Sequence, residues 1–182
     1  LFSMFTMTYR GYVDVCFLGV AQVDRFGNVN TTVIGDYYKP KMRLPGSGGA
    51  ADFLSYAKKT ILTMRGGEFV NKLDYFTSPG YLDGGDSRDA SGLFPKGSGP
   101  VMLLTTKGVF RFDEKTKELV LAKVHPGVGV DDIRKDIPWD LKIAPDLGET
   151  DRPTDVEIDF IRRFAPTEAV GRKLMYELAI AH

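Results

Sequence analysis

Short apolar runs, separated by turns rich in glycine and asparagine, dominate most of the chain. The first run, 12–18, ends at Gly19 and has the composition of a buried strand in an α/β sheet. Similar runs recur, with helical patterns between them. The other predicted strands are 29–34, 59–64, 69–76, 101–105, 109–113, 119–124 and an edge strand at 139–143, and the predicted short helices are 50–57 and 131–136. This mixture predicts an α/β fold: an open sheet with flanking helices and one antiparallel hairpin that turns at 114–117.

The C-terminal part of the chain has a helical pattern. Thr154 and Glu157 fit the capping box that opens a helix. Three apolar residues at a spacing of three give this helix an apolar face: Ile158, Ile161 and Phe164. A second helix is predicted over 167–182. We expect a single domain over residues 1–182 that ends in a helical tail at 154–182.

One long segment, 77–100, has neither period. It contains six glycines and three prolines together with several aspartates and serines. Loops of this length within a compact domain are usually functional or mobile, so the segment is a candidate for either role.

Composition excludes several classes of partner. The 182 residues carry 24 Lys and Arg against 24 Asp and Glu, which argues against a dedicated nucleic-acid or membrane-surface binder. A single cysteine, Cys16, forms no internal disulfide, so a reducing, cytoplasmic location is expected. The sequence has no apolar run of membrane-spanning length.

The glycine run after residue 44 is the strongest local signal. Pro45 restricts the chain before three glycines in four positions, and Ala50 begins a predicted helix. Backbone amides in such a turn bind anions or stabilise an oxyanion. The spacing is neither that of a dinucleotide-binding fingerprint nor that of a Walker loop. From pattern alone, a ligand cradle and a tight structural turn both remain open. The glycines are Gly46, Gly48 and Gly49.

The titratable side chains point to no separate catalytic centre. His125 and His182 are far apart, and His125 fits a turn-fixing residue after a strand. Cys16 lies in an apolar run without an activating neighbour, as expected of a small buried hydrophobe. One cysteine and two separated histidines predict no metal site.

Two groups of polar residues each have two interpretations. Gln22 and Asp24 follow the first strand, where α/β sheets place ligands, but they also suit a turn. Lys39, Lys41 and Arg43 alternate and would share one face of a strand, either to meet ligand phosphates or as an ordinary solvated face.

Several separate motifs together resemble the β subunits of family I coenzyme A transferases, of the glutaconate CoA-transferase type. The resemblance covers the chain from about residue 12 to about residue 165. It rests on the order and spacing of six segments: 17–32, 34–37, 40–50, 72–84, 112–117 and 125–128.

The resemblance implies an α/β CoA-transferase-like (isomerase-like) fold and an active site shared with an α subunit of similar fold. It implies that CoA moves between an acyl-CoA and a carboxylic acid, such as a dicarboxylic acid, through a glutamyl-CoA thioester. CoA is then a substrate, and no tightly bound cofactor is expected. Gly46 is implied as the backbone donor to the oxyanion. The residues implied to bind substrate or CoA are Gln22, Ser47, Gly48, Gly49 and Ala50.

The nucleophilic glutamate of that family has no counterpart here. In the family it precedes the segment that corresponds to 21–24 by several dozen residues, whereas the first glutamate of this chain is Glu68. We therefore expect the chain to be N-terminally incomplete and inactive alone. A subunit of a related CoA-ester hydrolase, in which water replaces the acceptor acid, and a non-catalytic partner subunit remain alternatives. A sugar-phosphate isomerase of related fold suits segments 47–50 and 75–83 less well.

Overall fold

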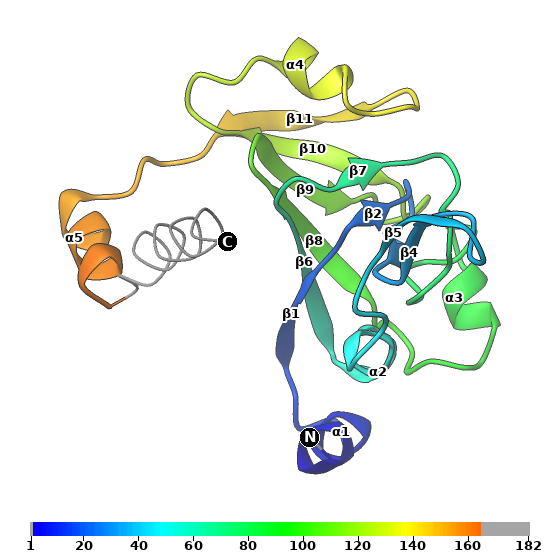
Figure 1. The fold of residues 1–182 in the computed structure, drawn as a ribbon. Helices are drawn as coiled ribbons and strands as arrows, with labels where there is room; N and C mark the ends of the chain where they lie inside the picture. Colours follow the sequence, from blue (N-terminus) through cyan, green and yellow to red (C-terminus); the bar gives the residue numbers. More distant parts are fainter. Residues whose placement is uncertain (1, 165–182) are drawn as a thin grey trace, which may run out of the picture. The chain divides into compact units, whose positions relative to one another are not determined.

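A six-stranded sheet forms the centre of the N-terminal part of the protein (Figure 1). The structure, a computed structural model, describes residues 2–164. Two compact units divide the chain, Leu1–Thr150 and Asp151–His182, and each is described by itself. The strands, in their order across the sheet, are β1 (Val15–Gly19), β6 (Lys59–Met64), β8 (Pro100–Thr105), β9 (Gly108–Phe112), β10 (Leu119–Val124) and β11 (Lys142–Glu149).

The sheet is mixed, and most of its neighbouring strands are parallel. β1, β6 and β8 run parallel to one another, β11 runs parallel to β10, and β9 is antiparallel to both of its neighbours. The predicted hairpin is therefore confirmed as β9 and β10, with Phe112 paired to Leu119. The carboxyl ends of β1, β6 and β8 meet at one edge of the sheet, where open α/β sheets place their ligands.

Two small sheets are built from the segments that leave this edge. One has the order β3 (Val29–Asn30), β2 (Gln22–Val23) and β7 (Glu68–Phe69). The other is the antiparallel ribbon of β4 (Val33–Gly35) and β5 (Pro40–Arg43). Together they carry the chain from β1 to the glycine run and from β6 to the long loop.

Five helices occur among the described residues: α1 (Phe2–Tyr9), α2 (Ala50–Tyr56), α3 (Ser87–Ala90), α4 (Val130–Arg134) and α5 (Asp155–Phe164). α1 was not expected from the sequence. It packs on α2 through aromatic pairs, with ring centroids 5.8 Å apart for Phe5 and Phe53 and 4.5 Å apart for Tyr9 and Tyr56. A Cβ on Gly49 would approach the Phe5 ring to 2.9 Å, so this glycine provides room for the helix pair.

The hydrophobic core lies on the sheet and under the elements that cover it. Leu62 and Leu103 come from the parallel strands, Phe110 and Leu121 from the hairpin, and Leu54 from α2. All five side chains have no exposed surface. Burial of this kind is the main favourable contribution to folding, at roughly 1.5–3 kcal/mol for each large apolar side chain.

Three strand predictions need correction. β1 was expected to be buried, but it lies at the edge of the sheet among the described strands, and the Phe17 side chain is 64% exposed. The predicted strand 69–76 pairs only at Glu68–Phe69, because Asp74 turns away to bind Gln22. The last strand, β11, runs from Lys142 to Glu149 rather than over 139–143.

The long loop is not structureless, because a buried arginine anchors it. The guanidinium of Arg88 in α3 donates to the carbonyl oxygens of Pro79, Gly80, Leu54 and Ser55 and to Ser98 Oγ. It also lies over the Phe94 ring at 4.1 Å from the ring centroid. The side chain is 1% exposed, and burial lowers the pKa of Arg88 to about 10. Loop 77–100 is thereby tied to the end of α2 and to the start of β8.

The C-terminal unit begins with the predicted capping box, which the structure confirms. Glu157 Oε2 accepts from the Thr154 amide at 2.8 Å, and the Glu157 amide donates to Thr154 Oγ1 at 3.2 Å. These bonds hold the pKa of Glu157 below its ordinary value. The helix predicted over 167–182, and with it the end of the predicted tail, lies outside the described residues. No helix within residues 2–164 is long and apolar enough to cross a membrane.

Candidate active site

The glycine run borders a cavity at the carboxyl ends of β1 and β6. The cavity has a volume of about 450 Å³. The backbone of 19–21 forms one side, Pro45–Ser47 and Ala50 form another, and Thr31, Thr63 and Arg65 complete it. Among the predicted site residues, Gly46, Ser47 and Ala50 are therefore brought together at this cavity.

The backbone of this glycine loop, residues 44–49, needs its glycines. Gly46 has a φ of +93° and Gly48 a φ of +52°, in the left-handed region that L side chains adopt only with strain. A Cβ at either position would meet nothing within 4 Å, so conformation rather than space explains both. α2 begins directly after the loop, where Ser47 Oγ accepts from the Ala51 amide at 3.1 Å.

The amide of Gly46, expected to face an oxyanion, is already used. It donates to the Thr31 carbonyl oxygen at 2.9 Å, while Thr31 Oγ1 donates to the Gly46 carbonyl oxygen at 3.0 Å. In contrast, the amides of Ser47, Gly48 and Gly49 donate to no acceptor within residues 2–164. The free donors of the loop therefore lie one to three residues beyond Gly46.

Gln22 is not at the cavity. It is 2% exposed in the small sheet, where its Nε2 donates to Asp74 Oδ2 at 3.0 Å. Its Oε1 accepts from Asn30 Nδ2 at 2.7 Å and from the Asp74 amide at 3.2 Å. Both ends of the amide are thus occupied by protein groups, and the side chain offers no unpaired atom to a ligand.

The same buried network supports Thr31. Asn30 Oδ1 accepts from the Thr32 amide at 2.9 Å, and the Thr31 amide donates to Thr77 Oγ1 at 3.0 Å. Thr77 begins the long loop, so the loop, the small sheet and the glycine loop are held together through residues 30–32. Sequence reasoning missed Thr31, because a threonine after a strand carries no signal of a contact 15 residues away.

The remaining titratable candidates have structural partners. His125 Nε2 lies 3.0 Å from the Thr105 carbonyl oxygen, which only accepts, so Nε2 carries the proton; Nδ1 then accepts from Thr150 Oγ1 at 2.8 Å. The Cys16 thiol lies 3.1 Å from Thr60 Oγ1, and burial raises the pKa of this thiol, which disfavours the nucleophilic thiolate. The turn-fixing interpretation of His125 and the packing interpretation of Cys16 therefore fit the structure.

The polar residues beyond β2 and on the ribbon are also engaged. Asp24 Oδ1 accepts from the amides of Phe26 and Asn28, which makes it the centre of a turn, and burial raises its pKa. In the ribbon, the pairing shifts at Lys41, so the simple alternation of 39, 41 and 43 is interrupted. Arg43 donates to the Tyr37 carbonyl oxygen at 2.7 Å.

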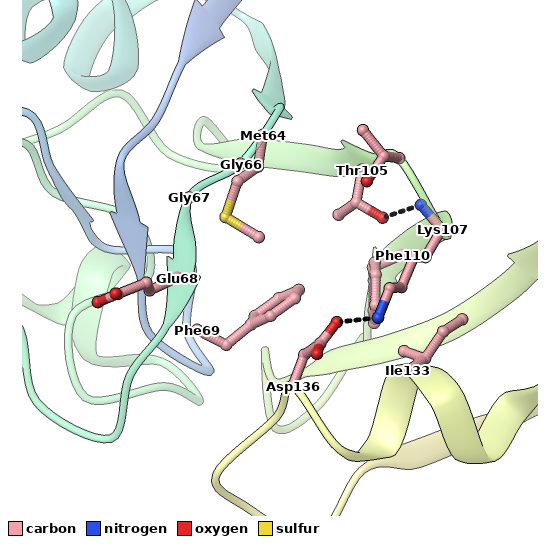
Figure 2. A pocket seen from close by; sticks show the side chains of 11 residues that line it. Met64, Gly66, Gly67, Glu68, Phe69, Thr105, Lys107, Phe110, Ile133 and Asp136 are labelled. Atoms are coloured by element: carbon pink, nitrogen blue, oxygen red, sulfur yellow. Dashed lines mark hydrogen bonds and ion pairs between the residues drawn. The ribbon is translucent and has the colours of Figure 1, made fainter.

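A second cavity, of about 370 Å³, lies at the carboxyl ends of β6 and β8 (Figure 2). Met64, Phe69, Phe110 and Ile133 give it an apolar floor. Lys107 crosses its rim and bonds to Asp136. No group of three or more His, Cys, Asp or Glu side chains suited to a metal occurs in the described part of the chain.

An α/β domain with ligand-sized cavities beyond the carboxyl ends of its parallel strands belongs to a broad class of enzyme folds. Comparison with known proteins defines the family. The model of the family described as "Coenzyme A transferase" matches residues 2–136. The chain belongs to the coenzyme A transferase family, which confirms the resemblance inferred from its motifs.

Three relatives set the scale of similarity, and the first two are the B subunits of CoA-transferases. The chain is 43% identical over 154 residues to that of the 3-oxoadipate CoA-transferase of Pseudomonas knackmussii, covering 84% of this chain and 58% of that protein. It is 42% identical over 150 residues to that of the glutaconate CoA-transferase of Acidaminococcus fermentans, covering 81% and 55%. The cholesterol ring-cleaving hydrolase IpdB subunit of Mycobacterium tuberculosis is more distant, at 25% over 147 residues, covering 80% and 57%.

A solved structure confirms the predicted fold. The crystal structure of glutaconate coenzyme A-transferase from Acidaminococcus fermentans matches with a TM-score of 0.77 and 39% sequence identity, covering 88% of this chain and 62% of that one. The chain thus spans little more than half the length of the curated relatives it matches.

Proposed function

We propose that this chain is part of the β subunit of a CoA-transferase that moves CoA between an acyl-CoA and a short carboxylic acid, with a dicarboxylic acid as one of the two. Two relatives at 42–43% identity support the proposal, because both are B subunits of CoA-transferases named for dicarboxylic acids. Because these relatives are single subunits of larger enzymes, they also support an α subunit as the partner that completes the active site.

The proposed chemistry is an exchange in two halves. A glutamate carboxylate of the enzyme attacks the thioester carbonyl carbon, and the CoA thiolate leaves from the resulting acyl-glutamyl anhydride. The thiolate then attacks the glutamyl carbonyl carbon, which releases the first acid and leaves a glutamyl-CoA thioester. The acceptor acid reverses these steps. Each attack places negative charge on a carbonyl oxygen, and that charge is what the enzyme must stabilise.

The glycine loop is the part of this chemistry that the chain itself supplies. The single observation that carries the proposal is its run of three unpaired amides, Ser47, Gly48 and Gly49, directly beyond a Gly46 that is held at both its amide and its carbonyl. We infer that one or more of these amides donate to the thioester oxyanion. Ala50 and the cavity beside the loop then contact the acyl-CoA.

Thr31→Val removes the hydroxyl that holds Gly46 and keeps the backbone bond. We expect kcat of the assembled enzyme to fall about tenfold with little change in KM, since losing one neutral hydrogen bond is worth about 1 kcal/mol. Thr31→Ser, which keeps the hydroxyl, is the matched control and should retain activity. Equal losses in Thr31→Ser and Thr31→Val would contradict this role.

The nucleophile is proposed to lie outside this chain's sequence. Glu68, the first glutamate, is exposed, and its side chain points away from the second cavity (Figure 2). The enzyme is also proposed to be cytoplasmic and to need no tightly bound cofactor.

The test uses the complete gene product assembled with its α subunit. We expect CoA to move from glutaryl-CoA to acetate, with negligible release of free CoA when the acceptor acid is omitted. Release of CoA at the same rate without an acceptor would replace the transferase with a hydrolase, a function favoured by the likeness to the IpdB subunit. A complex that assembles but converts no acyl-CoA would favour a non-catalytic subunit.

A further inference from the structure

The second cavity combines an apolar floor with a positively charged rim. Its floor is made by Met64 at the end of β6, Phe69 in β7, Phe110 in β9 and Ile133 in α4. Figure 2 shows Met64 and Phe69 directed into the space and Lys107 extended along its edge. At about 370 Å³, the volume falls within the range of small-molecule sites.

Lys107 keeps a hydrogen-bond donor to spare. Its ammonium donates to Asp136 Oδ2 at 2.6 Å and to the Asp132 carbonyl oxygen at 3.1 Å. A protonated lysine has three N–H groups, so one remains for a ligand. The ion pair is only half-buried, so a ligand can reach the ammonium.

The two cavities flank the end of one strand. Thr63 and Arg65 line the cavity at the glycine loop, whereas Met64 and Gly66 line the second cavity. Successive side chains of a strand point to opposite faces, and neighbouring strands are separated by about 4.8 Å. A short acyl chain whose thioester lies at the glycine loop therefore needs to pass over only the end of β6 to enter the second cavity.

We propose that the second cavity binds the remote end of a dicarboxylic acyl group, with Lys107 as the cation for its free carboxylate. The inference rests on the proposed function and names the residue that selects the substrate. The methylene chain packs on Met64 and Phe69, and the carboxylate accepts from the spare N–H of Lys107. Asp136 competes with this carboxylate for the same ammonium and so limits the affinity.

Two single variants break the same ion pair and have opposite predicted effects. Lys107→Met removes the cation, and KM for glutaryl-CoA should rise about 10- to 100-fold, the range for losing a charge-assisted hydrogen bond. Asp136→Asn frees the cation, and KM for glutaryl-CoA should fall. Butyryl-CoA, which lacks the second carboxylate, is the matched substrate, and its KM should stay within about twofold in both variants.

A merely structural ion pair gives a different pattern. Both variants would then shift KM in the same direction, or would affect glutaryl-CoA and butyryl-CoA alike, and either result overturns the inference. In those cases CoA transfer by the unmodified complex still stands, so the proposed function survives. If the unmodified complex transfers no CoA, calorimetric binding of glutarate replaces the kinetics; weaker binding to Lys107→Met and tighter binding to Asp136→Asn would support the site, and equal binding would refute it.

Discussion

Gly46→Val in the assembled enzyme should lower kcat by a factor on the order of 10²–10³ and leave KM within a fewfold range. A β-branched residue does not hold a φ of +93° without strain, so the loop must move. Movement separates Gly46 from Thr31 and displaces the three free amides beyond it. Losing an oxyanion donor reduces kcat on this scale, because the interaction forms only as charge develops. Steady-state kinetics with varied acyl-CoA measures both constants.

Gly127→Val is the matched control. Gly127 also has a positive φ, +80°, and a Cβ there would meet nothing within 4 Å, so the backbone strain is comparable. It lines neither cavity. The control should lose some stability and keep its kcat. Similar kcat values for a folded Gly46→Val complex and the unmodified one would remove the loop from the chemistry.

Arg88→Met should reduce the free energy of unfolding by roughly 3–5 kcal/mol, enough to unfold much of the protein at physiological temperature. The substitution keeps an apolar stem but leaves the carbonyl oxygens of Pro79, Gly80, Leu54 and Ser55 without their donor. Each buried acceptor left unpaired costs about 1–3 kcal/mol, and partial relaxation limits the sum. Urea unfolding, followed by the fluorescence of the single tryptophan, Trp139, measures the change.

Arg111→Met provides the comparison on the surface. Arg111 bonds to Asp146 at 3.0 Å, but both side chains are at least half exposed, so its loss should change stability by less than about 1 kcal/mol. If Arg88→Met is as mild as Arg111→Met, the long loop is not anchored through Arg88.

Local patterns were sufficient to predict the strands that pair with near neighbours or match the apolar rhythm. The prediction of 59–64 coincides with β6, and 114–117 joins the hairpin strands as expected. The predicted strand 69–76 was wrong at its far end, because Asp74 is held by Gln22 and by the Gly35 amide, 39 residues away in sequence. Contacts of that separation leave no trace in a local period.

The candidate site shows the same division. The glycine run was visible because it needs positive φ angles, which only a few residue types tolerate. The state of each amide was not visible, since the partner of Gly46 is a carbonyl group of Thr31 that any residue would supply equally well. Arg88 and Lys107 were also missed: a buried cation bound to carbonyl oxygens, and a lysine beside an apolar cavity, look like ordinary surface charges in a sequence.

Mass spectrometry of the assembled complex, quenched after mixing with acyl-CoA in the absence of an acceptor, tests the central claim most directly. The account predicts a CoA adduct on one glutamate outside the sequence of this chain, and a much smaller yield of that adduct with Gly46→Val in place. An adduct on Cys16 or Glu68, or turnover without any glutamyl-CoA adduct, would contradict it.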